Sequence, residues 1–576
     1  MIHYKMDYFE EVCCRIVDQC ILGGRMRKIS KPKFFLGAGI AFVIVGVIAY
    51  AAVAIYQHFY GMQLKDMKEL APVTEAEEYN IMYKGEYNQK AILVDDYIYL
   101  NMNVINEEWA HEMLFYAEDV DKILYTTYTY QEEFVMNGEK FKEWNGDIYI
   151  KAETAREMFG LLYAINENEK LVVIQDPGGL IGEVAKAGSY LLVSASEEER
   201  GYTKELKRGE VISLFEAEAE EYYFAMSHDG YTGYISKDRV KKSEEVISQK
   251  IPAEMEVSSQ KFPVEPISIA WHQIYTDEFY YETSVEIYDT AYFVDVVSPT
   301  WFKLNERGGI DSLANEEYVD YCKYRGKQVW ALFDNQFDDE ITYKALSNTE
   351  TRKKLCEKLL NFCEKYRLNG INVDFENMGE ESERYFIQFM RELSITLRSE
   401  GYILSVDTPV PSEWTDYYQR DVLYELCDFV IVMAYDEHYA GSEVAGSVSS
   451  QRFTMEAIYN MVQEGVKTDK LILGVPFYTR VWMGVEDLRS EAVGMNRAWG
   501  YVNDFGLDVV YDEKTGQNYA EGMVGETLYR IWLEDNTSMD WRLQLVLDND
   551  LAGVAAWSLG MESYDIWVEY QEAFYS

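Results

Sequence analysis

The sequence predicts an α/β protein whose largest part is a (β/α)8 TIM barrel over residues 265–576. Eight short apolar segments in that stretch alternate with helical patterns, which is typical of a closed parallel sheet. The fourth of these segments carries three polar side chains on one face. The chain before the barrel holds two groups of short β-type segments and one long uncharged apolar run. These features predict two small β-rich modules and one N-terminal transmembrane helix.

The composition favours a folded protein that does not bind nucleic acid. The 576-residue chain is long enough for roughly two to four domains. Lys and Arg total 53 against 100 for Asp and Glu, a formal net charge of -47. Such a surface repels phosphate backbones, so we expect no nucleic-acid partner. The seven cysteines form no CxxC pair and do not cluster with histidines, so we expect no zinc site and no disulfide framework.

The apolar run Phe34–Tyr56 predicts a membrane anchor. It contains no charged residue and is long enough to cross the roughly 30 Å apolar layer of a bilayer. Basic residues precede it and acidic residues follow it, so the positive-inside rule puts residues 1–33 in the cytoplasm. The predicted location is the cell membrane, with the catalytic domain outside the cell. The alternative is secretion after cleavage of a signal peptide, whose apolar region is usually only about 7–15 residues long.

Four segments connect this anchor to the barrel. Residues 57–88 are polar and acidic and are predicted to form a stalk. Residues 89–186 alternate apolar runs with hairpin signals such as Asn137-Gly138. Residues 187–242 form a second β module, which ends in the segment Gly-Tyr-Thr-Gly-Tyr-Ile at 230–235. Residues 243–264 are a polar linker.

Each β module resembles a known accessory domain. Residues 89–186 resemble the small domain named for the N-terminus of copper amine oxidases. The resemblance implies no copper chemistry, because His111 is the only histidine there. Residues 187–242 resemble bacterial Src-homology-type small barrels, which implies binding of cell-wall peptide or a role as a spacer. Another kind of small β barrel is the alternative for this second module.

The barrel prediction rests on eight strand candidates. They are residues 267–271, 292–299, 328–333, 370–376, 403–409, 429–436, 471–478 and 553–559. Amphipathic patterns such as residues 350–367 and 383–400 predict helices between them. The longer gap before the last strand leaves room for a small α+β insertion at about 485–530.

The fourth strand carries the predicted catalytic pair. Residues two apart on a strand point the same way, so Asn372, Asp374 and Glu376 face the barrel interior. Ile371, Val373 and Phe375 face the outer helices. Glu376 comes last and emerges at the C-terminal rim, where the active sites of such barrels lie. The alternative is a buried hydrogen-bond network that only holds the barrel together.

This pair suits the hydrolysis of a glycosidic bond. A glycosidase needs a carboxylic acid that can protonate the leaving oxygen. The negative charge of Asp374 is expected to raise the pKa of Glu376, which favours its acid form. No second carboxylate stands at the usual position of a nucleophile in this motif. That pattern favours a substrate-assisted route, in which the 2-acetamido oxygen of the sugar attacks C1.

The strand resembles the signature of glycoside hydrolase family 18, the chitinase-like barrels, usually D-x-x-D-x-D-x-E. The four positions hold Asn369, Asn372, Asp374 and Glu376. The two asparagines are similar to the branch that contains spore-cortex and cell-wall hydrolases. Asn372 can hydrogen-bond Asp374 but cannot accept its proton, which puts proton transfer along the strand in question.

Two more segments resemble the same family. Met433-Ala434-Tyr435-Asp436 matches its M-x-Y-D motif. The match implies that Tyr435 steadies the acetamido oxygen and that Asp436 positions the acetamido nitrogen. Trp557 resembles the tryptophan that floors the −1 sugar site, and a purely structural tryptophan is the alternative.

The remaining predicted substrate-binding residues follow from the resemblance. The segment GVPFYTRVW, with Tyr478 and Arg480, resembles the motif of the seventh strand. Arg480 either contacts substrate or forms a structural ion pair. Glu562 lies where relatives commonly carry an acid, and Asn372 completes the set. The resemblance implies no metal and no organic cofactor.

We therefore expect a membrane-anchored enzyme that cleaves β-1,4 bonds next to N-acetylated amino sugars, with retention of configuration. Asp374 would orient the acetamido group, and Glu376 would act first as acid and then as base. The expected partners are a glycan substrate and the membrane, and peptidoglycan is favoured because the enzyme would sit beside the cell wall. The alternatives are a chitinase-like hydrolase of other glycans, a non-catalytic glycan-binding barrel and a wall-tethered scaffold. Sporulation, division and general wall turnover remain equally compatible roles.

Overall fold

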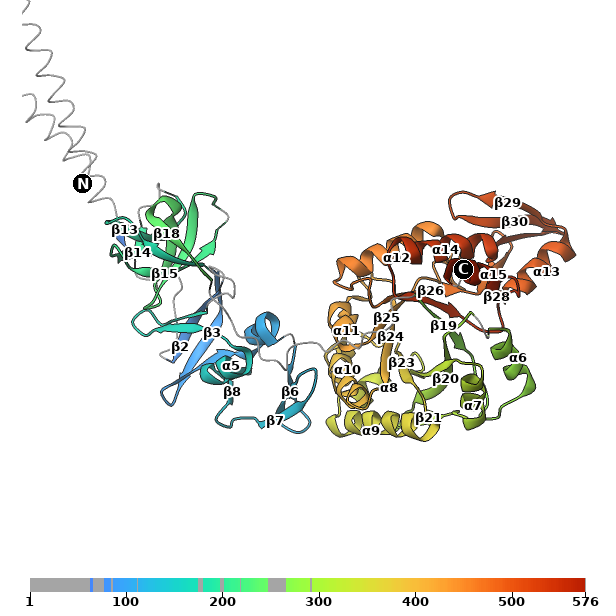
Figure 1. The fold of residues 1–576 in the computed structure, drawn as a ribbon, viewed down its shortest axis with the longest axis horizontal. Helices are drawn as coiled ribbons and strands as arrows, with labels where there is room; N and C mark the ends of the chain where they lie inside the picture. Colours follow the sequence, from blue (N-terminus) through green and yellow to red (C-terminus); the bar gives the residue numbers. More distant parts are fainter. Residues whose placement is uncertain are drawn as a thin grey trace, which may run out of the picture. The chain divides into compact units, whose positions relative to one another are not determined.

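The computed structural model describes residues 63–65, 77–83, 86–110, 112–174, 180–196, 201–217, 219–246, 266–290 and 293–574. The chain divides into two compact units, one from residues 1–88 and 162–248 and the other from residues 89–161 and 249–576. Figure 1 labels the helices and strands named below. The predicted transmembrane segment Phe34–Tyr56, the predicted cytoplasmic tail and most of the predicted stalk lie outside the described residues. Within the described ranges, no helix combines the length and the apolar character needed to cross a membrane.

The second unit contains a closed barrel of eight parallel strands. In spatial order the strands run β19-β32-β26-β25-β24-β23-β22-β20, and pairing of β19 with β20 closes the ring. Their bounds are β19 Ile267–His272, β20 Val296–Leu304, β22 Gln328–Asp334, β23 Gly370–Asp374, β24 Ile403–Pro409, β25 Phe429–Met433, β26 Leu471–Pro476 and β32 Gly553–Trp557. The short strand β21 Ile310–Ser312 pairs antiparallel with β20. The predicted TIM barrel is confirmed.

Helices alternate with these strands, as the sequence patterns predict. They are α6 Tyr281–Asp289, α7 Glu316–Tyr324, α8 Asp339–Leu346, α9 Thr349–Tyr366, α10 Glu383–Arg398, α11 Arg420–Leu426, α12 Gln451–Gln463, α14 Asn536–Asp548 and α15 Ile566–Phe574. Several begin at a side chain that caps the first turn. Asn348 and Ser450, for example, accept hydrogen bonds from the backbone N–H groups three residues later.

The second strand lies further along the chain than predicted. The sequence predicted residues 292–299, whereas β20 runs from Val296 to Leu304. Proline commonly ends a strand because it has no N–H to donate, but Pro299 lies inside β20. The register of β20 against β22 shifts between Thr300 and Phe302, so the ladder tolerates an irregularity just after the proline.

Large side chains fill the barrel interior. Trp271, Trp330, Ile431 and Ile472 are each fully buried in one apolar cluster. Strands buried on both faces read as continuous apolar runs, which explains why the eight strands could be recognised. Above this apolar layer, towards the C-terminal ends of the strands, the interior becomes polar and acidic.

The insertion before the last barrel strand forms a lobe of its own. Five strands pair in the order β28-β27-β31-β30-β29. Their bounds are β27 Tyr478–Met483, β28 Arg489–Gly494, β29 Asp508–Asp512, β30 Gln517–Val524 and β31 Thr527–Trp532, and α13 Met495–Phe505 packs against the sheet. The predicted α+β insertion is confirmed, although it extends slightly beyond the predicted range of 485–530.

Residues 89–161 form β-rich structure in the same unit as the barrel. The elements are β3 Glu86–Val94, β4 Tyr97–Asn101, α4 Met102–Ile105, a π-helical turn Asn106–Ala110, β5 Leu114–Ala117, β6 Lys122–Thr126, β7 Gln131–Val135, β8 Phe141–Trp144, β9 Asp147–Lys151 and α5 Ala152–Phe159. This segment contacts the outer barrel helices. Asp119 accepts hydrogen bonds from the backbone N–H and the hydroxyl of Thr349, at 2.8 and 2.7 Å, and so caps α9. Gln388 of α10 donates to Thr126 at 3.0 Å.

The first unit is built from short β-strands. An eight-stranded sheet has the order β1-β14-β13-β17-β16-β15-β12-β18. The bounds are β1 Gln63–Leu64, β12 Leu180–Val184, β13 Ser189–Leu192, β14 Gly201–Leu206, β15 Val211–Glu216, β16 Tyr222–Ser227, β17 Thr232–Ser236 and β18 Val240–Val246. The hairpin of β10 Tyr163–Asn166 and β11 Leu171–Ile174 pairs through β11 with β2 Glu78–Tyr83. The likeness of residues 89–186 and 187–242 to the two accessory domains stays a prediction.

Candidate active site

The predicted catalytic pair lies at the C-terminal end of β23. Asn372 and Asp374 belong to the strand and are 1% and 8% exposed, and Glu376 follows two residues later and is half-buried. Asn335 holds the backbone of Glu376 from the neighbouring strand end. Its side-chain amide donates to the carbonyl oxygen of Glu376 at 2.7 Å and accepts from the N–H of Glu376 at 3.0 Å. The position of Glu376 at the rim is therefore fixed even though the regular strand ends at Asp374.

The other face of the strand packs against α10. The ring of Phe375 stacks on Phe386 and Phe389 of that helix, with centroids 5.8 and 6.1 Å away. The hydroxyl of Tyr418 donates to the carbonyl oxygen of Phe375 at 2.7 Å. The predicted outward direction of Phe375 is confirmed, and these contacts anchor the chain between the two acids.

Glu376 has the electrostatic surroundings of a general acid. Burial is the largest cause that raises its pKa to about 7, and the carboxylates of Asp436 and Asp334 add to the rise. The direction agrees with the prediction. Asp374 and Glu376 repel each other, which raises the pKa of Asp374, and Asp436 and Asp334 add to the rise at Glu376. A pKa near 7 keeps a substantial fraction of Glu376 protonated at neutral pH, which general acid catalysis requires.

Asp374 is buried more deeply than Glu376, and its carboxyl group lacks hydrogen-bond donors in the described part of the chain. Burial raises its pKa well above the usual range, and the acids Glu376, Asp407 and Asp334 raise it further. Its Oδ1 atom is buried and has no hydrogen-bond partner among the described residues. Asp374 thus has an unused polar atom beside Glu376, as a group that orients a bound ligand would.

The predicted hydrogen bond between Asn372 and Asp374 is wrong. The side-chain oxygen of Asn372 accepts from the indole of Trp271 at 2.9 Å and from the hydroxyl of Ser298 at 3.1 Å. Its side-chain nitrogen donates to Asp407 on β24 at 2.8 Å. Asn372 is thus bound to three other strands inside the barrel, which favours a role in positioning over the predicted contact with substrate.

The segment after β25 brings a tyrosine and an acid to the same rim. The ring of Tyr435 lies 6.4 Å from Trp271 and 6.2 Å from Tyr478, edge to face in both cases. Asp436 has a left-handed backbone, with φ of 59°, and accepts a hydrogen bond from the Tyr478 hydroxyl at 2.6 Å. Tyr435, Asp436 and Tyr478 therefore form one connected group next to Glu376.

The other predicted residues take more varied places. Trp557, at the end of β32, is half-buried with its ring 5.8 Å from Trp271, so it lies over the polar interior. Arg480 donates to Ser490 at 3.0 Å, and among the described contacts it makes no ion pair. The side chain of Glu562 accepts from the N–H of Gly560 at 2.7 Å, which stabilises the turn after β32. Among the described residues, no group of three or more His, Cys, Asp and Glu side chains is arranged to hold a metal ion.

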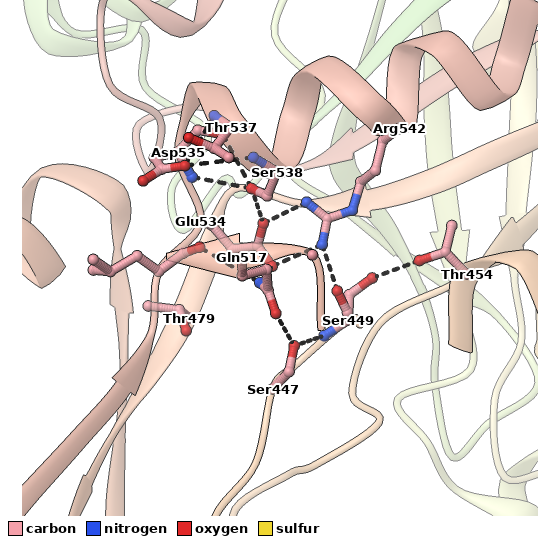
Figure 2. Close-up of polar contacts among 12 residues, drawn as sticks. Ser447, Ser449, Thr454, Thr479, Gln517, Glu534, Asp535, Thr537, Ser538 and Arg542 are labelled. Carbon is pink, nitrogen blue, oxygen red and sulfur yellow. Dashed lines mark hydrogen bonds and ion pairs between the residues drawn. The ribbon is translucent and has the colours of Figure 1, made fainter. Parts of the chain in front are cut away.

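A buried ion pair lies near the segment that follows β25 (Figure 2). Arg542 of α14 and Glu534, which follows β31, are both completely inaccessible to solvent and pair with each other. Glu534 also accepts from Ser538 at 2.7 Å and from Gln517 of the insertion lobe at 2.8 Å. Both oxygens of this buried carboxylate therefore accept hydrogen bonds, and its charge faces that of Arg542.

The ion pair is connected to the segment that carries Tyr435. Arg542 donates to the carbonyl oxygen of Ser449 at 2.6 Å, and the hydroxyl of Ser449 donates to the carbonyl oxygen of Ala434 at 2.7 Å. Ser447 donates to Gln517 at 2.5 Å (Figure 2). Because Ala434 directly precedes Tyr435, this network fixes the backbone that presents the tyrosine to the site.

Sequence reasoning missed three polar residues of the site. Asp334 ends β22, Asn335 follows it, and Asp407 lies within β24. All three stand near the C-terminal ends of parallel strands, and those ends meet at one edge of the barrel. A search for every polar residue at that end of each predicted strand could have found them.

Comparisons with known proteins agree with this geometry. Residues 307–562 match the family described as glycosyl hydrolases family 18. The chain is 24% identical over 294 residues to the uncharacterized glycosylase YvbX of Bacillus subtilis, which covers 48% of this chain and 83% of that protein. It is 21% identical over 255 residues to the cortical fragment-lytic enzyme of the same species, covering 42% of this chain and 58% of that enzyme.

One solved structure supports the fold. The spore cortex-lytic enzyme SleL of Bacillus cereus aligns with a TM-score of 0.51 and 18% sequence identity. The alignment covers 54% of this chain and 75% of that chain. At this level of identity the likeness concerns the fold of the barrel.

Proposed function

We propose that the chain cleaves β-1,4 bonds in a glycan that contains N-acetylglucosamine, because residues 307–562 match glycosyl hydrolases family 18. Peptidoglycan is the favoured substrate, and the route is retaining and substrate-assisted. The observation that carries the proposal is the pKa of Glu376, raised to about 7 by burial and by neighbouring acids at the barrel rim. A carboxyl group in this state can protonate a leaving oxygen at neutral pH.

In the proposed mechanism each residue acts at a stated atom. Glu376 donates its proton to the glycosidic oxygen while the acetamido oxygen of the substrate attacks C1 and displaces the leaving sugar. Asp374 orients the acetamido group through its unpartnered oxygen. Tyr435 steadies the acetamido oxygen. Glu376, now a carboxylate, then removes a proton from the water that opens the oxazolinium ring, which restores the acid and retains the configuration at C1.

Exposed aromatic side chains support a polymeric substrate. Tyr275, Trp414 and Tyr564 are 83%, 85% and 77% exposed, and each lies in a segment that follows a barrel strand at the C-terminal end. Aromatic rings offer flat apolar surfaces to the C–H faces of sugars. Such rings at the rim are suited to sugars on either side of the cleaved bond.

The choice of peptidoglycan rests on context. One relative is named a cortical fragment-lytic enzyme and one structural neighbour a spore cortex-lytic enzyme. The apolar run Phe34–Tyr56 would hold the enzyme at the outer face of the cell membrane, next to the wall. Membrane fractionation of cells that express the full chain tests this location. Recovery from the culture medium with a shortened N-terminus would favour secretion instead.

The direct test is muropeptide analysis of purified peptidoglycan incubated with the full chain. We expect new N-acetylglucosamine reducing ends from the wild type and none from Glu376→Gln. Glu381→Gln is the matched control, because Glu381 is exposed on the connection between β23 and α10. Release of products from chitin oligosaccharides alone, in a parallel assay, would replace peptidoglycan by a chitin-like substrate.

A second candidate is a glycan-binding protein without hydrolytic activity. The asparagine at position 372 favours it, because an amide cannot accept a proton from Asp374. Retained binding to peptidoglycan without cleavage by the wild type, on every glycan tried, would establish this alternative. The raised pKa of Glu376 favours the hydrolase.

A further inference from the structure

A carboxylate that no motif accounts for lies beneath the site. Asp407 of β24 is 1% exposed and points into the barrel interior, where it meets Asn372 of β23 and Trp271 of β19. No Lys, Arg or His side chain bonds to it among the described residues. A buried acid without a cation is costly unless its hydrogen bonds or its charge serve a purpose.

The contacts of Asn372 define the state of Asp407. The indole N–H of Trp271 and the hydroxyl of Ser298 both reach the same side-chain atom of Asn372, at 2.9 and 3.1 Å. An indole N–H can only donate, so that atom is the amide oxygen. The amide nitrogen therefore faces Asp407 and donates to its Oδ1 at 2.8 Å, while Trp271 also donates to Oδ2 at 3.2 Å. Both oxygens of Asp407 are acceptors, as in an ionised carboxylate.

Asp374 has the opposite surroundings. Its buried Oδ1 receives no hydrogen bond from the described residues. Burial and the charge of Glu376 raise the pKa of both acids. The Asn372 and Trp271 donors oppose the rise at Asp407, whereas at Asp374 the acids Asp407 and Asp334 add to it. Hydrogen-bond donors stabilise an ionised carboxylate, so a negative charge on this pair is favoured at Asp407, which has two donors, over Asp374. The proton then stays on Asp374.

We propose that Asp407 is a positioning residue for the reaction at Glu376: fixed by Asn372 and Trp271, it holds the negative charge that keeps Asp374 protonated. The inference rests on the proposed function. It also resolves the question raised by the asparagine at position 372, because the second carboxylate comes from β24 instead of β23. A protonated Asp374 can donate to the neighbouring Glu376 or accept from a bound acetamido N–H without leaving a buried charge unpaired.

Several titratable groups lie around Asp407, and their pKa values are expected to change when its charge is removed. Asp374 and Glu376 face it from β23, Tyr435 follows β25, and Asp334 ends β22 and acts on both acids of β23. Replacing Asp407 by Asn removes a negative charge from this group. Asp374 and Glu376 then lose their protons at lower pH, so the alkaline limb of kcat/KM is expected to move down by about one pH unit.

A charge swap separates electrostatics from packing. In the double variant Asn372→Asp/Asp407→Asn, the carboxylate moves to β23 while Trp271 and Ser298 still find an acceptor. We expect the alkaline limb to return to its wild-type position. Asp428→Asn is the matched control. Asp428 is buried just before β25, accepts from the Leu404 N–H at 2.9 Å and faces Arg398 at 3.6 Å. Its replacement is expected to lower stability and leave the limb in place.

The pH at which kcat/KM falls on the alkaline side tests the proposal. An unchanged limb in Asp407→Asn, or a limb in the swapped variant that stays with the single variant, would overturn it.

A second readout works even if no glycan is cleaved. A carboxyl with a raised folded-state pKa stabilises the fold below its unfolded pKa of about 4 and loses this contribution as pH rises through the folded pKa. The wild-type Tm is therefore expected to fall more steeply between pH 5 and 9 than that of Asp407→Asn, and the swap is expected to restore the slope. Equal slopes in the wild type and Asp407→Asn would contradict the proposal. Absence of hydrolysis would count only against the proposed function.

Discussion

The barrel domain contains two groups of charged side chains that differ in their hydrogen-bond partners. We call Asp334, Asp374, Glu376, Asp407 and Asp436 the acidic cluster. It contains five carboxyls, and no Lys or Arg bonds to them among the described residues. The second group is the ion pair of Glu534 and Arg542 with the side chains bonded to it.

The difference lies in hydrogen-bond supply. Glu534 accepts from Arg542, Ser538 and Gln517, and these partners oppose the rise in its pKa that burial causes. Asp374 has a buried oxygen with no partner, and Glu376 has a pKa raised to about 7. An ion pair with its hydrogen bonds in place maintains geometry, because taking up a proton or exchanging a partner would not stabilise it. A cluster of carboxyls that lacks hydrogen-bond donors and cations can take up a proton or a ligand, which is what a catalytic site requires.

The same substitution in the two groups gives the sharpest contrast, and the largest effect is expected at Glu376. Glu376→Gln removes the proton donor, so hydrolysis is expected to fall by roughly 10³-fold, about 4 kcal/mol of transition-state stabilisation. Its Tm is expected to stay the same or rise, because a carboxyl surrounded by acids is replaced by a neutral group. Reducing-end assays and thermal unfolding measure the two quantities. A large loss of Tm with normal activity per folded molecule would contradict the assignment.

Glu534→Gln is expected to do the reverse. It leaves the Arg542 guanidinium buried without its counterion, which costs about 3–5 kcal/mol of unfolding free energy. Activity per folded molecule at low temperature is expected to stay within about threefold of wild type, because Glu534 does not contact the substrate. Urea unfolding followed by tryptophan fluorescence measures the loss. Stability equal to wild type would show that the network is redundant.

The sequence predicted the fold better than it predicted the hydrogen bonds within the site. Buried parallel strands produce apolar runs that are visible locally, so eight strands and the insertion were recognised. The predicted range 292–299 only partly overlaps the observed strand Val296–Leu304, in which Pro299 lies inside the strand. Alternation along β23 correctly turned Phe375 outwards, because that rule depends only on the backbone of one strand.

The contacts of Asn372 could not be predicted in the same way. Its partners Trp271 and Asp407 are 101 and 35 residues away in the chain. Such pairs depend on strand register around the closed barrel, which a single sequence does not reveal. The local guess, Asp374 two residues away, was wrong because neighbours on one strand face compete with closer groups on adjacent strands. Asp407 was overlooked for the same reason.

A smaller effect tests whether the acidic cluster acts as a unit. Asp334→Asn keeps the acceptor for the N–H of Gln336, at 2.9 Å, but removes a charge that raises the pKa of Glu376. The alkaline limb of kcat/KM lies near pH 7 in the wild type, because hydrolysis requires protonated Glu376. It is expected to move down by about half a pH unit in the variant. A limb that does not move would show that burial alone sets this pKa.

The smallest effect is expected at the exposed rim, which lies outside both the acidic cluster and the buried ion pair. Trp414 is 85% exposed, but its segment is held rigid by Arg420, whose guanidinium donates to the carbonyl oxygen of Pro409 at 3.0 Å and to the hydroxyl of Thr415 at 2.9 Å. A backbone held in place loses less conformational freedom when the exposed indole binds a sugar, and one ring contact contributes about 1 kcal/mol.

Trp414→Ala is therefore expected to raise KM for long glycan strands about fivefold, with kcat and Tm unchanged. Tyr324→Ala is the matched control, because Tyr324 is 81% exposed at the end of α7, at the opposite end of the barrel from the site. Substrates of different length sharpen the result. A change in KM that is the same for disaccharides and for long strands would mean that Trp414 lies at the cleavage site itself, whereas an effect limited to long strands would assign it to a sugar further along the chain. No change for any substrate would remove Trp414 from the binding surface and leave glycan recognition to the buried groups beneath the rim.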